Sequence, residues 1–177
     1  MQKIYIDFDG VIMDTITVIQ SLAESVGLDY KNYDAMKEYL TKIKYKDILD
    51  NSTYINDAMY HIENLMKCGD FDIKILTHVI TLDEAEEKIK FIRKYNKDVD
   101  IIVVPKDIDK SVAINPVGAI LIDDYTGNLR IWKEHGGIGV RFSPKRNGKG
   151  FFAISSLDQI LEMFEEDNGG VKECYKL

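Results

Sequence analysis

The sequence predicts an α/β protein, with an open parallel sheet of about five strands and a small helical segment inserted after the first strand. Three observations indicate this fold class. Short runs rich in β-branched residues recur along the chain, amphipathic helical patterns separate most of them, and residues 15–69 contain helical patterns alone. Runs that are short and continuously apolar are typical of strands buried on both faces, as in a parallel sheet.

Each predicted strand is a short apolar run that ends at a polar or turn-forming group. The runs are Ile4–Ile6, Ile73–Leu76, Ile101–Val104 and Ala119–Ile122, with a further candidate at Ile138–Phe142. Where strands and helices alternate in this way, we expect right-handed crossovers between parallel strands.

Three helices are predicted after the second strand from apolar residues near helical spacing. Residues 81–96 begin with acidic side chains, which suit the first turn of a helix. Residues 124–137 end in paired glycines, a common stop signal, and 155–167 form a final amphipathic pattern.

The inserted segment, 15–69, shows no convincing strand. Its helical patterns cover 18–27, 33–43 and 55–69. We therefore divide the chain into a discontinuous core, 1–14 and 70–177, and a helical insertion, 15–69.

Size and charge limit the possible functions. The chain has 177 residues, 30% of them charged, and a formal net charge of −7 at pH 7. This size suits one core domain with an insertion. The acidic balance argues against binding to polymeric nucleic acid but is compatible with a small phosphorylated substrate. The sequence lacks a run of about 18 apolar residues, so we expect no membrane association through a spanning helix.

Cysteine usage and the first apolar run predict a cytoplasmic protein. Cys68 and Cys174 show no CxxC or Cys/His spacing, which favours a reducing compartment. The first apolar run has no basic flank and is interrupted by Asp7 and Asp9, unlike the long apolar stretch of a signal peptide.

The sequence DFDG follows the first predicted strand and places two carboxylates two residues apart. In an extended chain, Asp7 and Asp9 point to one side and Phe8 to the other. Gly10 permits a sharp turn or a close approach of the backbone to a ligand. Asp and Gly are also common turn formers, so this stretch alone fits a structural turn equally well.

A second acidic pair, Asp123 and Asp124, follows another predicted strand. In open α/β sheets, ligands bind beyond the carboxyl ends of the strands, so four carboxylates would meet if both strands are central. Like charges about 4 Å apart repel by about 1–4 kcal/mol per pair, which protons or a cation must offset. Oxygen ligands without Cys or well-placed His favour Mg²⁺. Asp123 is also a suitable helix N-cap.

Polar groups follow two further predicted strands. Thr77 ends one of them, and a hydroxyl there suits a phosphate oxygen, although threonine is also common in strands. His78 could contact a substrate or simply pack. Lys106 and Lys110 follow the next strand. An ammonium there could offset the charge of a carboxylate and a phosphate, but lysines in loops are usually solvated.

Taken in order, the stretches DFDGV, LT, K and LIDD resemble the four motifs of the haloacid dehalogenase-like phosphohydrolases. The resemblance covers about residues 1–13 and 71–142, and the helical insertion lies where that superfamily inserts its cap. It implies a Rossmann-like three-layer core with a small helical cap. The motifs DFDGV and LIDD and the small cap look most like the 5′(3′)-deoxyribonucleotidase, or 5′-nucleotidase, branch.

The resemblance implies roles for the four acids. Asp7 would attack phosphorus and form an aspartyl-phosphate, and Asp9 would protonate the leaving oxygen and later activate water. Mg²⁺ would be bound by Asp7, by the backbone carbonyl of Asp9 and by Asp124, or less readily Asp123.

It also implies a phosphate site. Thr77, with His78 as a weaker candidate, and Lys110 would hold the transferring phosphoryl group together with Asp7. Lys110 is preferred over Lys106 as the motif lysine because it opens a predicted helix that leads to the next strand.

These roles predict magnesium-dependent hydrolysis of a small phosphomonoester, with a nucleoside monophosphate preferred as substrate. The alternatives are another small ester, such as a sugar phosphate, and a non-catalytic phosphate-binding module. Tyrosines of the insertion could stack on a base or fill the core of the cap: Tyr30, Tyr33, Tyr39, Tyr45, Tyr54 and Tyr60. A response-regulator receiver fits less well, because receivers have their acid pair near the first strand and here the pair Asp123 and Asp124 comes last. A Rossmann oxidoreductase also fits less well, because no GxGxxG follows the first predicted strand of this chain.

Overall fold

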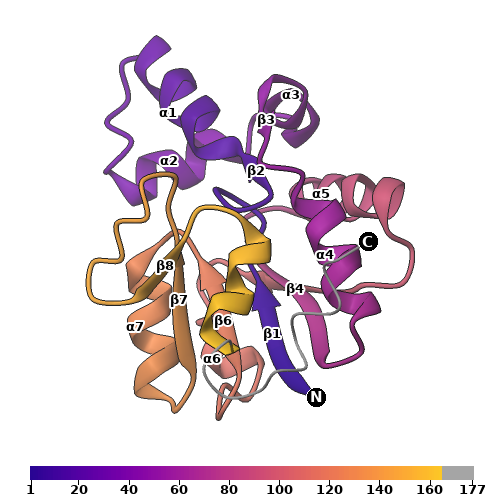
Figure 1. The fold of residues 1–177 in the computed structure, drawn as a ribbon. Helices are drawn as coiled ribbons and strands as arrows, with labels where there is room; N and C mark the ends of the chain where they lie inside the picture. Colours follow the sequence, from indigo (N-terminus) through magenta and orange to yellow (C-terminus); the bar gives the residue numbers. More distant parts are fainter. Residues whose placement is uncertain (165–177) are drawn as a thin grey trace.

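The computed structural model describes residues 1–164, which contain a six-stranded parallel sheet flanked by helices (Figure 1). The strands are β1 (Gln2–Ile6), β4 (Phe71–Val79), β5 (Asp100–Pro105), β6 (Ile120–Asp123), β7 (Ile138–Phe142) and β8 (Phe152–Ile154). Their order is β5-β4-β1-β6-β7-β8. The chain therefore builds outward from β1 on one side and then on the other. Such a switch in strand order is where ligands bind in open α/β sheets.

Helices cover both faces of this sheet and give the three-layer architecture that the sequence predicts. One face is covered by α4 (Ala58–Lys67), α5 (Leu82–Tyr95) and the 3₁₀ helix η1 (Leu157–Phe164). The other face is covered by α7 (Thr126–Glu134), beside the short α6 (Lys110–Ala113). In β1, β4, β5 and β6, the apolar side chains alternate between the two layers, as the pleat of a strand requires.

The central strand β1 shows this alternation clearly. Ile4 and Ile6 are fully buried against the layer of α4, and Tyr5 faces the opposite layer. There the Tyr5 ring makes an edge contact with Trp132 of α7, with 5.5 Å between ring centroids. Burial on both faces explains why the first apolar run has no polar residue before Asp7.

The inserted segment rises beyond the carboxyl ends of the strands (Figure 1). Its helices are α1 (Thr15–Ser25), α2 (Tyr33–Leu40) and α3 (Tyr45–Asn51). Side-chain caps begin two of them, because Asp14 accepts a hydrogen bond from Thr17 N and Asn32 accepts one from Ala35 N. At the base, β2 (Met13–Asp14) pairs antiparallel with β3 (Thr53–Tyr54), so the segment leaves and rejoins the core at one place. We call residues 15–51 the cap segment.

Helix α4 packs with the core, although the predicted insertion, 15–69, includes it. Ala58, Met59, Ile62 and Leu65 lie on its buried face, in one cluster with the apolar residues of β1 and β4. An amphipathic pattern alone does not tell whether its apolar face meets a sheet or another cap helix. The part of the insertion that stands beyond the sheet therefore ends before α4.

Other expectations need correction. The sheet has six strands where about five are predicted, because β8 was missed. The short pair β2–β3 and helix α3 were also missed within and beside the insertion. The final predicted helix, 155–167, is a 3₁₀ helix over Leu157–Phe164; residues 155 and 156 precede it, and residues 165–167 lie outside the described residues. No helix in residues 1–164 is both long enough and apolar enough to cross a membrane.

Candidate active site

The switch in strand order brings the two predicted acidic motifs together. Strands β1 and β6 are neighbours in parallel register, with Ile6 opposite Ile122, and Asp7 N donates to the Ile122 carbonyl over 2.9 Å. Asp7 and Asp123 therefore follow adjacent strands at the same edge of the sheet. Both side chains are held in the interior, since Asp7 is 7% exposed and Asp123 is fully buried.

Asp124 joins this pair to form a cluster of three carboxylates. One oxygen from each of Asp7, Asp123 and Asp124 lies within 4.8 Å of the others. Gly10 lies directly against the third member: a Cβ on Gly10 would come within 2.5 Å of Asp124 Oδ2. Gly10 also has a φ of +72°. The turn after Asp9 thus uses glycine both for its backbone angle and for the room that Asp124 needs.

Lys110 offsets part of this negative charge. Its Nζ lies 2.8 Å from Asp123 Oδ2 and 3.0 Å from Asp7 Oδ1, and its side chain is almost completely buried. Burial would lower the pKa of Lys110, but Asp123 and Asp7 raise it above its ordinary value. Lys106, the reserve candidate, is exposed. The structure thus places Lys110, and not Lys106, between the candidate nucleophile and the second acidic motif.

One ammonium does not neutralise three carboxylates, of which Asp7 and Asp123 are buried and Asp124 is half-buried. Burial and the charges of Asp123 and Asp9 raise the pKa of Asp7 to about 6, although Lys110 opposes the shift. Burial and the neighbouring acids raise the pKa of Asp124 to about 8. Such a cluster takes up either protons or a cation. Carboxylate oxygens at these separations are the ligands that Mg²⁺ prefers, so the residues present fit that ion.

Asp123 is fixed by several donors besides Lys110. Asn128 Nδ2 donates to Asp123 Oδ2 over 2.8 Å, and Tyr125 N donates to Asp123 Oδ1 over 2.8 Å. Tyr125 is itself the residue that precedes α7, and no side chain caps this helix, so the expectation that Asp123 is the N-cap is wrong. Asp123 is therefore oriented by the protein, whereas the Asp124 carboxylate has more freedom to meet a ligand.

The Asp9 carboxylate points to a different set of partners. Oδ1 accepts hydrogen bonds from the hydroxyls of Thr15 and Tyr45, each over 2.7 Å, and Oδ2 lies 2.5 Å from Lys88 Nζ. Burial would raise the pKa of Asp9, but Lys88 and these hydrogen bonds lower it below its ordinary value. Asp9 is therefore held as a carboxylate and stands apart from the three-acid cluster.

Thr77 and His78 lie on β4, beside β1. Thr77 is fully buried, and its hydroxyl accepts a hydrogen bond from Lys88 over 3.1 Å. His78 Nε2 donates to the Ile108 carbonyl over 2.9 Å, so its neutral ring carries no proton on Nδ1. Burial, with Lys110 and Lys106, lowers the pKa of His78 to about 4. Such a ring has no N–H left for a phosphate, so we do not retain His78 as a phosphate ligand.

Sequence reasoning missed Lys88 and Glu84 of α5, which lie 2.7 Å apart. A Glu-Lys pair four residues apart usually indicates an exposed ion pair. The available signal was the helical face: Ala85, Lys88 and Ile92 share the buried side of α5, so the lysine interrupts an apolar stripe. Tyr45 was considered only for stacking on a base or filling the cap.

The cap segment touches the core close to Asp9 and near the loop after β5. Tyr45 N donates to Asp83 over 2.7 Å, while Tyr33 OH and Lys37 Nζ contact Asp107 at 3.1 and 2.5 Å. Tyr54 instead stacks on Tyr95 of α5. Among the tyrosines that could stack on a base or fill the core of the cap, Tyr45 thus reaches Asp9.

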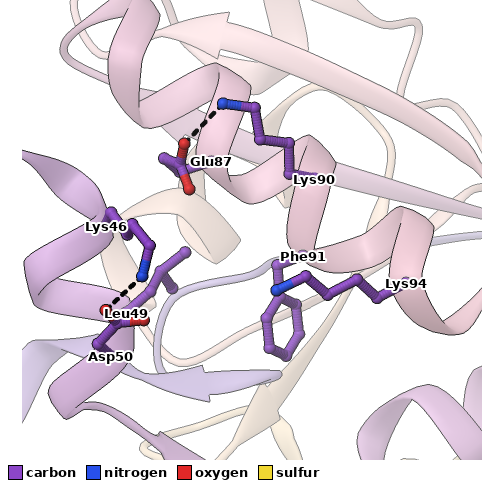
Figure 2. Close-up of a pocket in the computed structure, with 7 residues that line it drawn as sticks. All are labelled: Lys46, Leu49, Asp50, Glu87, Lys90, Phe91 and Lys94. Carbon is purple, nitrogen blue, oxygen red and sulfur yellow. Dashed lines mark hydrogen bonds and ion pairs between the residues drawn. The ribbon is translucent and has the colours of Figure 1, made fainter.

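A separate hollow of about 160 Å³ lies between α3 and α5 (Figure 2). Leu49 and Phe91 form its apolar part, and its lysines include Lys46 and Lys90. Lys46 pairs with Asp50, and Lys90 pairs with Glu87. Its lining includes no member of the acidic cluster, so the hollow is distinct from the site at the strand ends.

Comparisons with known proteins agree with this fold. A hydrolase from Pseudomonas syringae has a TM-score of 0.64 at 11% identity, covering 95% of this chain and 100% of that one. A HAD-superfamily hydrolase, subfamily IA, from Geobacter sulfurreducens PCA has a TM-score of 0.62 at 14% identity, covering 92% and 99%. D,D-heptose 1,7-bisphosphate phosphatase from B. bronchiseptica, solved with magnesium and phosphate, has a TM-score of 0.54 at 14% identity. The match covers 95% of this chain and 100% of that one.

No protein-family model matches the chain, and no curated protein sequence matches it. At these low identities, the similarity defines the fold: a three-layer α/β core like that of the HAD-superfamily hydrolases.

Proposed function

We propose that the protein is a magnesium-dependent phosphomonoester hydrolase that acts through an aspartyl-phosphate, with a 5′-nucleoside monophosphate as the preferred substrate class. The observation that carries the proposal is the position of Asp7, which lies against the buried ammonium of Lys110 and within a cluster of three carboxylates. The residues of the superfamily motifs thus meet at one strand edge although they are far apart in the sequence.

Asp7 is the nucleophile in this proposal. Its carboxylate oxygen attacks phosphorus, and the bond from phosphorus to the leaving oxygen breaks. Two negative groups can approach each other only if their charge is offset, and Lys110 supplies part of that offset at 3.0 Å. Asp7, Asp123 and Asp124, with the Asp9 carbonyl, would hold Mg²⁺, which when bound stabilises negative charge on the phosphoryl oxygens.

Asp9 acts as the general acid and then as the general base in this proposal. It donates a proton to the leaving oxygen in the first step, and the charge of a bound phosphate favours its prior protonation. In the second step its carboxylate accepts the proton of the attacking water. The bond between phosphorus and the Asp7 oxygen then breaks, which releases phosphate and restores Asp7. Thr77 lies on β4 and shares Lys88 with Asp9, and its hydroxyl is proposed to hold a phosphoryl oxygen.

The cap segment, α1–α3, is proposed to cover the site and to select the leaving group. Tyr45 lies beside Asp9, which places an aromatic ring on the side where the leaving group would lie. A base could meet this ring, but so could a sugar. One structural neighbour is a heptose bisphosphate phosphatase, which keeps a sugar phosphate as the second candidate substrate.

The test is hydrolysis of 4-nitrophenyl phosphate by the purified protein, with Mg²⁺ and with EDTA. We expect the wild-type protein to turn over the substrate with Mg²⁺ and not with EDTA, and we expect Asp7→Asn to have lost this turnover. The matched control is Asp98→Asn, because Asp98 is exposed and remote from the cluster. Turnover in EDTA, or a fully active Asp7→Asn, would refute the mechanism. Phosphate binding without turnover would favour the non-catalytic module. Nucleoside monophosphates compared with sugar phosphates then distinguish the two substrate classes.

A further inference from the structure

Lys88 is a buried lysine that the mechanism above does not use. It lies on the inner face of α5 and is fully buried, which lysines almost never are unless they are paired. Its Nζ lies 2.5 Å from Asp9 Oδ2, 2.7 Å from Glu84 Oε1, 2.8 Å from the His78 carbonyl and 3.1 Å from Thr77 Oγ1. These four acceptors exceed the three hydrogens that an ammonium can donate.

The surroundings hold the ammonium in one place. The rings of Phe8 and Tyr45 lie 5.5 and 5.3 Å from Nζ, within the range of cation–π contact. Glu84, the second acidic partner, is itself fixed because its Oε2 accepts a hydrogen bond from Ile80 N over 2.7 Å. Lys88 is therefore anchored by the core and offered to Asp9 at a fixed position.

A purely structural role does not explain this arrangement. A buried ion pair contributes little net stability, and apolar residues of similar size often replace one without loss. The Lys88–Glu84 pair would also be complete without Asp9. Instead, one ammonium connects Asp9, the proposed acid and base, with Thr77, the proposed phosphoryl ligand. Asp9 lies in the turn after β1 and Thr77 lies on β4, and Lys88 joins them from α5.

We propose that Lys88 is a positioning residue: it fixes the Asp9 carboxylate and the Thr77 hydroxyl relative to Asp7. This inference rests on the proposed hydrolase function. Asp9 is used in both chemical steps, first at the leaving oxygen and then at the attacking water. If Asp9 is displaced, the step that depends more strongly on proton transfer should therefore slow more than the other step.

The two steps can be separated with 4-nitrophenyl phosphate, because nitrophenolate leaves with little help from an acid. In Lys88→Met, formation of the aspartyl-phosphate should stay close to the wild-type rate, and its hydrolysis should slow by about 10²-fold. Rapid mixing should then show a burst of nitrophenolate close to one equivalent per protein, followed by slow turnover. With an alkyl phosphate, whose leaving group needs a proton from the acid, Lys88→Met should also form the aspartyl-phosphate more slowly than the wild type.

Two further variants complete the experiment. Lys88→Met leaves Asp9 and Glu84 without their shared cation, so the charge-balanced double variant Lys88→Met/Glu84→Gln provides a second test with the same expected burst. Lys90→Met is the matched control, because Lys90 is exposed on the same helix and pairs with Glu87. It should keep wild-type kinetics.

The possible outcomes are distinct. Steady-state turnover of either Lys88 variant within threefold of wild type would overturn the positioning role. Parallel loss of burst and turnover, or failure of both variants to fold, would show a structural role and equally overturn it. If the wild-type protein hydrolyses no phosphate ester with Mg²⁺, the proposed function fails and this inference fails with it.

Discussion

Replacement of Lys110 by methionine tests the charge balance of the candidate site. Lys110 connects Asp7 and Asp123, and its side chain is 2% exposed. Methionine is close to lysine in length and is apolar, so Lys110→Met removes the ammonium and retains most of the volume. The variant would leave two buried carboxylates facing each other without their shared cation.

The magnitude follows from the distances. At 2.8 and 3.0 Å, each ion pair has a gross Coulomb energy of about 5–6 kcal/mol at an effective dielectric constant of about 20. Desolvation of the ammonium and the carboxylates cancels much of this gross energy. Removal of one partner from a buried pair costs about 3–5 kcal/mol, because the remaining charge stays buried. We expect Lys110→Met to lower the free energy of unfolding by that amount at pH 7.

Urea unfolding measures the stability change, and hydrolysis of 4-nitrophenyl phosphate measures the catalytic change. We expect kcat/KM to fall by at least about 10²-fold, as when a single electrostatic donor is removed from other active sites. The control is Lys106→Met, since Lys106 is exposed in the preceding loop. It should change the free energy of unfolding by less than about 0.5 kcal/mol. A loss below about 1 kcal/mol for Lys110→Met, or a larger catalytic effect at Lys106, would refute the reasoning.

Two further predictions concern Gly10 and His78. Gly10→Ala should lower the free energy of unfolding by about 1–3 kcal/mol and weaken Mg²⁺ binding measured by calorimetry, because its φ is +72° and its Cβ would meet Asp124. Gly27→Ala is the control, since Gly27 has a φ of +71° with nothing within 4 Å. If Gly10→Ala and Gly27→Ala affected Mg²⁺ binding equally, the clash of the new Cβ with Asp124 would not explain the weaker binding.

For His78, the folded pKa of about 4 lies below the ordinary 6.5. The unfolded chain therefore binds the proton first, and stability is lost as pH falls from 6.5 toward 4. That shift corresponds to about 3 kcal/mol, which partial exposure of the ring reduces to about 1–2. Urea unfolding of His78→Asn should show a smaller loss between pH 7 and 4.5, and an equal loss would count against the burial argument.

The strand-end residues of the site could be predicted from sequence because position in an α/β fold follows from local patterns. A buried run followed by acids, repeated at two strands, is sufficient to bring Asp7 and Asp123 together once the strands are parallel and adjacent. Lys110 lies in a short helix between two such strands, so the same reasoning reached it. Strand β8 could not be predicted, because its three residues, one of them exposed, are too few to form a recognisable apolar run.

Lys88 and Tyr45 could not be placed in the same way. Each approaches Asp9 from a helix, and their positions depend on how α5 and α3 pack over the strand edge. Periodicity shows which face of a helix is buried, but not which residue lies opposite it. For the same reason, the sequence does not show that α4 packs on the sheet: its apolar face suits either a cap or a sheet.

The two buried lysines divide the charges of the site into two groups. Lys110 joins Asp7 to Asp123, and Lys88 joins Asp9 to Glu84, so the proposed nucleophile and the proposed acid and base each have a separate cation. Asp124 has no ion pair with a described residue, and burial and the neighbouring acids raise its pKa to about 8.

Asp124 is therefore the member of the acidic cluster that has no lysine partner of its own among the described residues, and its raised pKa favours a bound proton until a cation replaces it. A divalent cation there would meet oxygens of Asp7, Asp123 and Asp124, which lie within 4.8 Å of one another, whereas the Asp9 carboxylate pairs with Lys88. In the proposed mechanism, this separation would leave the Asp9 carboxylate for proton transfer and its backbone carbonyl for a bound metal. The pairing of charges thus accounts for why two aspartates only two residues apart would perform different tasks.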